Sequence, residues 1–268
     1  MQNRKWIFMR ILYEDNFMII VDKPSGQLVQ SGKSFDMDLT SEVLNYRKQK
    51  GEIPYAAVIN RLDRPVSGLV LFAKDKKSAA KYSKILGQQG INKHYICAVC
   101  GYVQPQTGTM VDYLLKDAKE NCSKVVRADK SGAKKAELNY RVINYHSDWN
   151  CTFLDVELIT GRHHQIRTQF SSRGHVLAGD YKYLTVDKEN KETCAFLAEK
   201  LNLKKNEIAL CAYSIEIFGK LYKTNPDWAK YITSNWINWC NLEIINPDMN
   251  CKNWWFYLEV RLCKKFGL

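Results

Sequence analysis

The sequence has no long hydrophobic run. No stretch of about 18 consecutive apolar residues occurs in its 268 residues, so we expect no membrane-spanning helix. The first residues, MQNRKWIFMR, lack both an apolar core segment and a small-residue cleavage site, which argues against a secretory signal. Hydrophobic residues make up 46% and charged residues 25% of the chain, as in an ordinary globular protein. We therefore expect a cytoplasmic protein with one sizeable core.

The sequence also lacks motifs for metal or nucleotide-phosphate binding. It contains no GxGxxG or P-loop pattern, and the CxxC pair Cys97 and Cys100 has no second pair at zinc-ligand spacing. That pair lies in the apolar run YICAVCG, so we interpret both thiols as reduced core residues. His163 and His164 are adjacent, and no third ligand is spaced to join them. We expect no metal and no cofactor.

Positive charge, in contrast, is in excess. The chain has 40 lysines and arginines against 28 aspartates and glutamates, a net charge of +12. A protein this basic often binds a polyanion, of which nucleic acid is the commonest. The alternative is a basic, solubilising surface without such a partner, and charge alone does not decide between the two.

Hydrophobic patterning predicts a chain that mixes strands and helices without internal repeats. Apolar runs at 9–13 and 17–21 indicate a hairpin. Residues 104–135 are polar, and we expect them to be irregular. Further strands are expected at 56–59, 69–73, 94–99, 151–160, 208–212 and 215–218, and helices at 40–48, from Asp75 to about residue 86, and at 162–173.

The first segment that suggests chemistry is the polar loop at 60–68, between two apolar strands. It places the carboxylate of Asp63 between Arg61 and Arg64. Loops at strand ends often carry functional groups, and neighbouring guanidinium groups favour the ionised carboxylate. Asp63 is therefore a candidate catalytic anion. The alternative, which is the commoner fate of an aspartate between arginines, is that it pairs with Arg64 and orders the turn.

The second segment is LITGRHHQIR at 158–167, in which a strand leads through Gly161 into a predicted helix. Its cationic side chains suit a phosphate or a catalytic carboxylate, although a solvated helix face is the usual outcome. His163 and Arg167 are four residues apart, so we expect them on one face. A third candidate, Tyr95, begins a strand, where it either packs or stacks on a base.

Taken together, these segments resemble the RluA family of RNA pseudouridine synthases over residues 9–219. Where that family typically reads H-R-L-D-R-x-T-S-G-L-L-L-F-A-K, residues 60–74 read N-R-L-D-R-P-V-S-G-L-V-L-F-A-K. Where it reads T-G-R-x-H-Q-I-R, residues 160–167 read T-G-R-H-H-Q-I-R. The early K-P-x-G at 23–26, K-H-Y at 93–95 and G-D-x-x-Y at 179–183 also match.

The resemblance implies roles for the candidate residues. Asp63 matches the family's essential aspartate, Arg167 the arginine that pairs with it, and Tyr95 the tyrosine that stacks on the target uracil. The expected RNA- and substrate-binding residues are Arg61, Arg64, Arg162 and His163, the first of them near the extruded base. Asn60, Val66 and Cys211 replace a common His, Thr and His, and we expect these changes to leave activity intact.

The resemblance also implies a fold and a function. We expect the α+β pseudouridine synthase fold, with a mixed, largely antiparallel sheet, flanking helices and a central basic cleft. Residues 1–225 would form the catalytic domain without an N-terminal S4 domain, and 226–268 a Trp-rich C-terminal extension of unknown role. We expect a cytoplasmic monomer that flips a uridine out of structured RNA, ribosomal RNA before transfer RNA, and isomerises it.

Two alternative functions follow from the same residues. The first is a non-catalytic RNA-binding or ribosome-assembly protein on the same fold, which the joint presence of Asp63, Tyr95 and Arg167 argues against. The second is a nucleoside hydrolase or glycosylase, which would release the flipped base. Such enzymes usually need an activated water, and the sequence places no second carboxylate beside Asp63.

Overall fold

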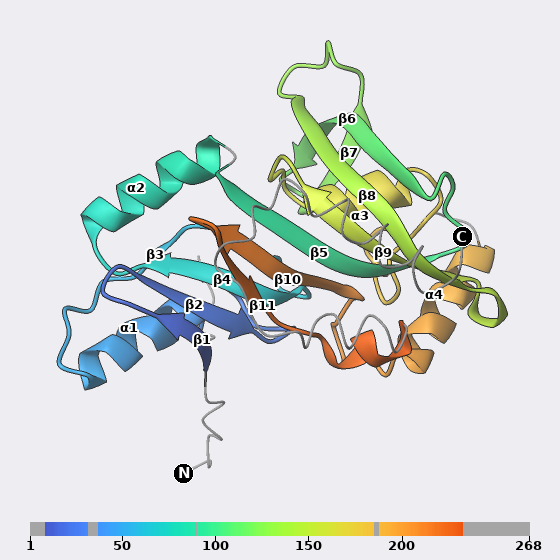
Figure 1. Ribbon diagram of the computed structural model, residues 1–268. Helices are drawn as coiled ribbons and strands as arrows, with labels where there is room; N and C mark the ends of the chain where they lie inside the picture. The colour runs from blue at the N-terminus through green and yellow to red at the C-terminus, as the bar shows by residue number, and fades with distance from the viewer. Residues whose placement is uncertain (1–8, 32–36, 89, 185–187, 233–268) are drawn as a thin grey trace, which may run out of the picture.

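Figure 1 shows a computed structural model of the chain, which describes residues 9–31, 37–88, 90–184 and 188–232. The described helices are α1 (Leu39–Gln49), α2 (Lys76–Gly87), α3 (Gln165–Ser171), α4 (Lys188–Lys200) and the short 3₁₀ helices η1 (Ser147–Trp149) and η2 (Asp227–Tyr231). The strands are β1 (Arg10–Glu14), β2 (Met18–Lys23), β3 (Ala57–Val58), β4 (Ser67–Ala73), β5 (Ile91–Cys100), β6 (Thr107–Asp117), β7 (Cys122–Val126), β8 (Lys134–His146), β9 (Cys151–Leu158), β10 (Leu210–Ile217) and β11 (Lys220–Lys223).

The described strands form one sheet in the order β1-β2-β4-β10-β5-β9-β8-β6-β7, with β3 paired to β4 and β11 to β10. The β4–β10 pair is parallel and the other pairs are antiparallel, which confirms the predicted α+β class with a mixed, largely antiparallel sheet. Strand β10 comes late in the sequence but lies in the middle of the sheet, between β4 and β5 (Figure 1).

Side-chain alternation along the strands divides the core between the two faces of the sheet. On β2, Ile19 and Val21 pack with α1 and α3 on one face, whereas Met18 and Ile20 pack with α2 on the other. Successive residues of a strand point to opposite faces, so both faces of a central strand are apolar when helices cover both. Helix α4 packs on the same face as α2, over the far half of the sheet.

The CxxC pair follows the same rule. Cys97 and Cys100 are both buried and belong to the cores on opposite faces of β5. The two sulfur atoms therefore do not face a common ligand, and the interpretation of the pair as core packing is confirmed.

Two helices begin where aspartates were available to cap them. The Oδ1 atom of Asp75 accepts a hydrogen bond from the Ser78 amide at 2.8 Å, and α2 starts at the next residue, as predicted. Asp38 caps α1 in the same way, through the amide of Ser41 at 2.7 Å. Such caps satisfy amide groups that have no partner within the helix.

Gly68 allows β4 and β10 to lie directly side by side. It has a positive φ of 113°, and a Cβ atom at this position would lie 2.3 Å from the carbonyl oxygen of Ala212. A larger residue would separate the two strands just where the 60–68 loop enters the sheet. The glycine therefore fixes the loop relative to β10.

The structure corrects two expectations about secondary structure. Residues 104–135 are not irregular: they form β6, β7 and the start of β8 at one edge of the sheet. These strands are largely exposed, and in β6 only Met110 and Leu114 are fully buried, so they lack a long apolar run. The two strands expected at 208–212 and 215–218 are one strand, β10, with an irregularity between Cys211 and Ser214.

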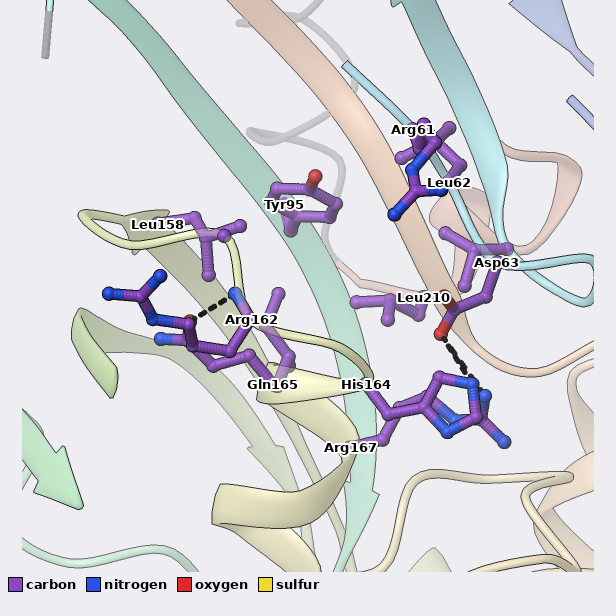
Figure 2. Close-up of a pocket in the computed structure, with 13 residues that line it drawn as sticks. Arg61, Leu62, Asp63, Tyr95, Leu158, Arg162, His164, Gln165, Arg167 and Leu210 are labelled. Atoms are coloured by element: carbon purple, nitrogen blue, oxygen red, sulfur yellow. Dashed lines mark hydrogen bonds and ion pairs between the residues drawn. The ribbon is translucent and has the colours of Figure 1, made fainter. Parts of the chain in front are cut away.

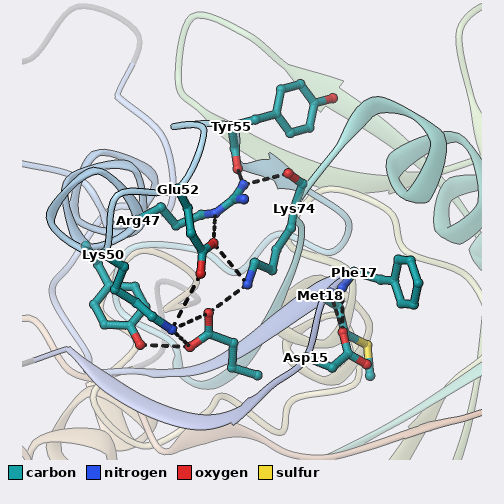
Figure 3. Close-up of polar contacts among 10 residues, drawn as sticks. Asp15, Phe17, Met18, Arg47, Lys50, Glu52, Tyr55 and Lys74 are labelled. Carbon is teal, nitrogen blue, oxygen red and sulfur yellow. Dashed lines mark hydrogen bonds and ion pairs between the residues drawn. The ribbon is translucent and has the colours of Figure 1, made fainter.

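A network of charged side chains ties α1 to the sheet (Figure 3). The Nζ atom of Lys74 lies 2.8 Å from Glu14 and 3.1 Å from Glu52, and Arg47 lies 2.9 Å from Glu52. Burial alone would raise the pKa of Glu14, but hydrogen bonds from Lys74 and its neighbours lower this pKa to about 2. Glu14 is therefore ionised at neutral pH, and the network joins β1, α1 and the end of β4.

The predicted C-terminal extension is described only at its beginning. Trp228 of η2 is 1% exposed and packs in the core beneath α4. Residues 233–268, with the other tryptophans of the extension, lie outside the described residues. The division of the chain at residue 225 therefore stays a prediction. None of the described helices is long and apolar enough to cross a membrane.

Candidate active site

A pocket lies where the 60–68 loop, β5, the end of β9 and the start of β10 meet (Figure 2). It has a cavity volume of about 90 Å³ and opens to solvent, so it is smaller than the ~300–1,000 Å³ range of small-molecule sites. Five of the predicted site residues line it: Arg61, Asp63, Tyr95, Arg162 and Arg167. Two others, Arg64 and His163, do not.

The loop that carries Asp63 is held at both ends. Asn60 is buried, donates a hydrogen bond to the Leu69 carbonyl at 3.0 Å and accepts one from the Leu71 amide at 2.8 Å. On the other side, the fully buried Lys23 donates from Nζ to the carbonyl of Arg64 at 3.3 Å and to two carbonyls of its own loop. Burial lowers the pKa of Lys23 to about 8. The K-P-x-G segment therefore acts as a clamp on the loop that carries Asp63, a role that the sequence did not predict.

Arg64 belongs to this clamp. Its Nε atom donates to the carbonyl of Gly26 at 2.9 Å, and the Gly26 amide donates back to the Arg64 carbonyl at 2.8 Å. The predicted binding residue is thus also part of the connection between the two loops.

The predicted ion pair between Asp63 and Arg167 is present. Nη1 of Arg167 lies 3.1 Å from Oδ2 of Asp63, across 104 residues of sequence. Among the described residues, no hydrogen bond or ion pair reaches Oδ1 of Asp63. The arginine therefore holds the carboxylate by one oxygen, and the Asp63 side chain as a whole is 28% exposed.

Arg167 has a second acidic partner that the sequence analysis missed. Asp180 accepts two hydrogen bonds from it, at 2.7 Å from Nε and 2.8 Å from Nη2, and both side chains are almost fully buried. Burial alone would lower the pKa of Arg167, but the hydrogen bonds and charges of Asp180 and Asp63 raise it. Asp180 lies in the G-D-x-x-Y segment at 179–183, which matches the family pattern but for which the sequence predicts no contact with Arg167.

The turn before α3 differs from its prediction. The helix begins at Gln165 rather than Arg162, because His164 adopts a left-handed backbone conformation with φ 52°. The buried Gln165 side chain stabilises the turn: it accepts hydrogen bonds from Thr160 at 2.7 Å and from the Arg162 amide at 3.0 Å.

This turn brings His164, and not His163 as predicted, to the side of Arg167. His163 does not share a helical face with Arg167; its Nδ1 atom lies 2.9 Å from Oγ of Ser123 on β7. Instead, Nε2 of His164 lies 3.4 Å from Oδ2 of Asp63, beside Arg167 (Figure 2). Burial and the nearby charge of Arg167 lower the pKa of His164 to about 2, so the ring is neutral and its contact with Asp63 is not an ion pair.

Tyr95 places its ring in the pocket from β5, on the same sheet face as α3 (Figure 2). It is 6% exposed, and burial, followed by the charge of Asp63, raises its pKa. The phenol is therefore protonated at neutral pH. Arg61 lies at the exposed rim, and Arg162 donates from Nε to the Lys135 carbonyl at 2.7 Å.

The neutral state of His164 predicts acid sensitivity. Its pKa is about 2 in the folded protein against 6.5 in the unfolded chain, so between these values the unfolded chain binds more protons. The free energy of unfolding should therefore fall by about 1–2 kcal/mol as pH drops from 7 to 5. The measurement is urea unfolding at both pH values for wild type and His164→Asn. Equal pH dependence in the two proteins would show that His164 is not buried in its neutral form.

Comparison with known proteins accounts for this combination of fold and site. The family model of RNA pseudouridylate synthases matches residues 17–172, and the chain belongs to this family. It is 32% identical over 176 residues to ribosomal large subunit pseudouridine synthase D of Nitrosomonas europaea, covering 65% of this chain and 49% of that protein. It is 30% identical over 173 residues to ribosomal large subunit pseudouridine synthase C of Escherichia coli, covering 65% and 52%. The RluA family predicted from the motifs is thus confirmed.

The chain spans about half the length of the curated relatives it matches. Two solved human structures share the fold. RNA Pseudouridylate Synthase Domain Containing 1 aligns with a TM-score of 0.62 at 18% identity, covering 84% of this chain and 86% of that one. RNA Pseudouridylate Synthase Domain Containing 4 aligns with a TM-score of 0.63 at 20% identity, covering 78% and 84%.

Proposed function

We propose that the protein isomerises uridine to pseudouridine in RNA, with Asp63 as the catalytic carboxylate. The observation that carries this proposal is that Asp63 is the sole carboxylate among the described residues that line the pocket, and that Arg167 fixes one of its oxygens. The names of the relatives in Nitrosomonas europaea and Escherichia coli favour large-subunit ribosomal RNA as the substrate. Transfer RNA is the second candidate.

The reaction rearranges the nucleotide without adding or removing atoms. The bond between N1 of uracil and C1′ of ribose breaks, the base turns, and C5 bonds to C1′ while the C5 proton is lost and N1 gains a proton. Asp63 would start the reaction either by adding to C1′ or by taking a proton as the base leaves. Both routes need a carboxylate oxygen that can face the sugar, and the contacts of Asp63 through Oδ2 rather than Oδ1 support this role.

Tyr95 is suited to stack on the extruded uracil. A base cannot be reached inside a helix, so the uridine must flip into the pocket. An aromatic ring on a rigid strand offers a stacking surface at low entropic cost. Arg61, at the rim, is placed to occupy the gap that the base leaves in the RNA.

We expect Tyr95→Phe to reduce turnover modestly and Tyr95→Ala to reduce it much more. The phenylalanine keeps the stacking ring, whose loss costs ~1–3 kcal/mol per base. Single-turnover rates on a large-subunit ribosomal RNA transcript provide the measurement. Wild-type rates for both variants would show that Tyr95 only packs in the core.

The edge strands carry positive charge that favours RNA binding. Lys124 and Arg127 of the β6–β7 region are 67% and 88% exposed, and each forms a surface ion pair, with Asp117 and Asp129 respectively. Together with Arg61, Arg64, Arg162 and His163, they would guide the phosphate backbone toward a basic cleft at the pocket. Such contacts position RNA without reading its sequence, so they do not select the uridine.

The proposal is tested by incubating the purified chain with a large-subunit ribosomal RNA transcript and a transfer RNA transcript. Pseudouridine formation without free uracil is the expected result. Release of free uracil would favour a glycosylase, and binding without any change in the RNA would favour a non-catalytic RNA-binding protein.

A further inference from the structure

His164 and Tyr183 lie behind the catalytic carboxylate, in contacts that the proposed mechanism does not use. Nδ1 of His164 lies 2.8 Å from the hydroxyl oxygen of Tyr183, and Nε2 of the same ring lies 3.4 Å from Oδ2 of Asp63. The ring of Tyr183 packs against the guanidinium of Arg167, at 4.9 Å from the ring centroid. One tyrosine thus contacts both groups that hold Asp63.

The roles of the two ring nitrogens in these contacts follow from the chemistry of their partners. The backbone amide of Ser123 donates to the Tyr183 hydroxyl at 2.8 Å, so the tyrosine oxygen accepts there. The hydroxyl proton is then available to Nδ1 of His164. At the other end, a carboxylate oxygen of Asp63 can only accept. A neutral imidazole satisfies both neighbours when its proton is on Nε2 and Nδ1 is the acceptor.

The surroundings of His164 keep it in this neutral form. Its side chain is 7% exposed, and Arg167 and the stacked ring of His163, 3.8 Å away, disfavour a positive charge. A second full cation beside Asp63 would neutralise the carboxylate further. A neutral ring with its N–H beside Oδ2 instead leaves the charge of the carboxylate available for the reaction.

We propose that Tyr183 is a positioning residue for catalysis, which fixes the Nε2–H tautomer of His164 so that His164 holds Asp63 in its reactive orientation. This inference rests on the proposed function for its effect on rate, but the tautomer itself is a property of the free protein. Tyr183→Phe removes only the hydroxyl and keeps the ring against Arg167. Tyr181→Phe is the matched control, because Tyr181 is 56% exposed on the same loop.

The first test needs no RNA. Long-range ¹H–¹⁵N spectra of histidine-labelled protein at pH 7, with His164→Asn to assign the signal, report the tautomer of His164. We expect Nε2–H in wild type and in Tyr181→Phe, and a changed tautomer population or a protonated ring in Tyr183→Phe. A proton on Nδ1 in wild type, or an unchanged signal in Tyr183→Phe, would overturn the proposal.

The second test measures single-turnover pseudouridine formation on a large-subunit ribosomal RNA transcript between pH 5 and 8. Tyr183→Phe should lower the rate about 10- to 100-fold, as expected for a misplaced catalytic group, while RNA affinity changes less than about twofold. The loss should be larger at low pH, where His164 can take up a proton. Equal losses at all pH values with a weakened fold would indicate a purely structural role.

A double variant separates an effect of Tyr183 that acts through His164 from a general effect on packing. His164→Gln keeps a neutral donor near Asp63 but has no tautomer, so Tyr183→Phe should cost little extra in that background. His164→Ala should be less active than His164→Gln. Additive losses in the double variant would exclude action through His164. If wild-type protein forms no pseudouridine on any RNA tested, the proposed function fails, whereas the spectra still decide the tautomer.

Discussion

The Asp63→Asn variant is expected to lose pseudouridine formation by about 10³-fold or more. An asparagine at this position can neither add to C1′ nor take a proton, and a carboxylate in such a role contributes at least ~10²–10⁴ in rate. The amide is nearly the same size as the carboxylate, so the pocket keeps its shape. The measurement is single-turnover pseudouridine formation on the transcript that wild type modifies.

The fold should survive this change. Arg167 keeps both hydrogen bonds to Asp180, so no buried cation loses its last partner. The Asp63 side chain is 28% exposed, and we expect the free energy of unfolding to change by less than about 1 kcal/mol. RNA affinity should also be nearly unchanged. Turnover within tenfold of wild type would show that Asp63 is not the catalytic carboxylate.

The Arg167→Ala variant is expected to be both inactive and unstable. It releases Asp63 and also leaves the 2%-exposed carboxylate of Asp180 without its cation. Removing one partner of a buried ion pair costs about 3–5 kcal/mol, because the remaining charge is unpaired in an apolar environment. The free energy of unfolding, measured in urea, should fall by this amount.

Arg167→Lys should recover part of the stability and little of the activity. A lysine restores the charge, but one ammonium group cannot reproduce the fork that binds Asp180 through two atoms and Asp63 through a third. Arg127→Ala is the control for stability, because its pair with Asp129 is on the surface and 88% and 71% exposed. If Arg167→Ala has the same free energy of unfolding as this control, the buried ion pair does not stabilise the fold.

The pairing of Asp63 with Arg167 was predictable because each residue lies in a motif that the family resemblance assigns a role. The helices α1 and α2 were also predictable, since each has an apolar stripe and α2 has Asp75 as a cap just before it. The two helices depend on neighbours in the sequence, so the local pattern was enough to place them. The ion pair spans 104 residues and was predictable only through the resemblance.

The features that were missed depend on contacts distant in sequence. The left-handed conformation of His164 ends the expected helix early, and nothing in the segment T-G-R-H-H-Q-I-R marks which histidine turns toward Asp63. Asp180 meets Arg167 only because the chain after α3 folds back beneath it. Strands β6 and β7 have exposed, polar faces, so their pairing with each other and β8 is not visible as an apolar alternation.

The central place of β10 determines when the site can exist during synthesis of the protein. In the described sheet, β10 joins β4, next to the Asp63 loop, to β5, which carries Tyr95. Before residue 210 has left the ribosome, β10 is missing from the sheet. The two halves of the pocket then lie on separate sheet fragments. The side chains of Asp63, Tyr95 and Arg167 then lack a common frame, although all three residues have been translated. We therefore expect an unfinished chain to lack the assembled pocket until β10 has been synthesised.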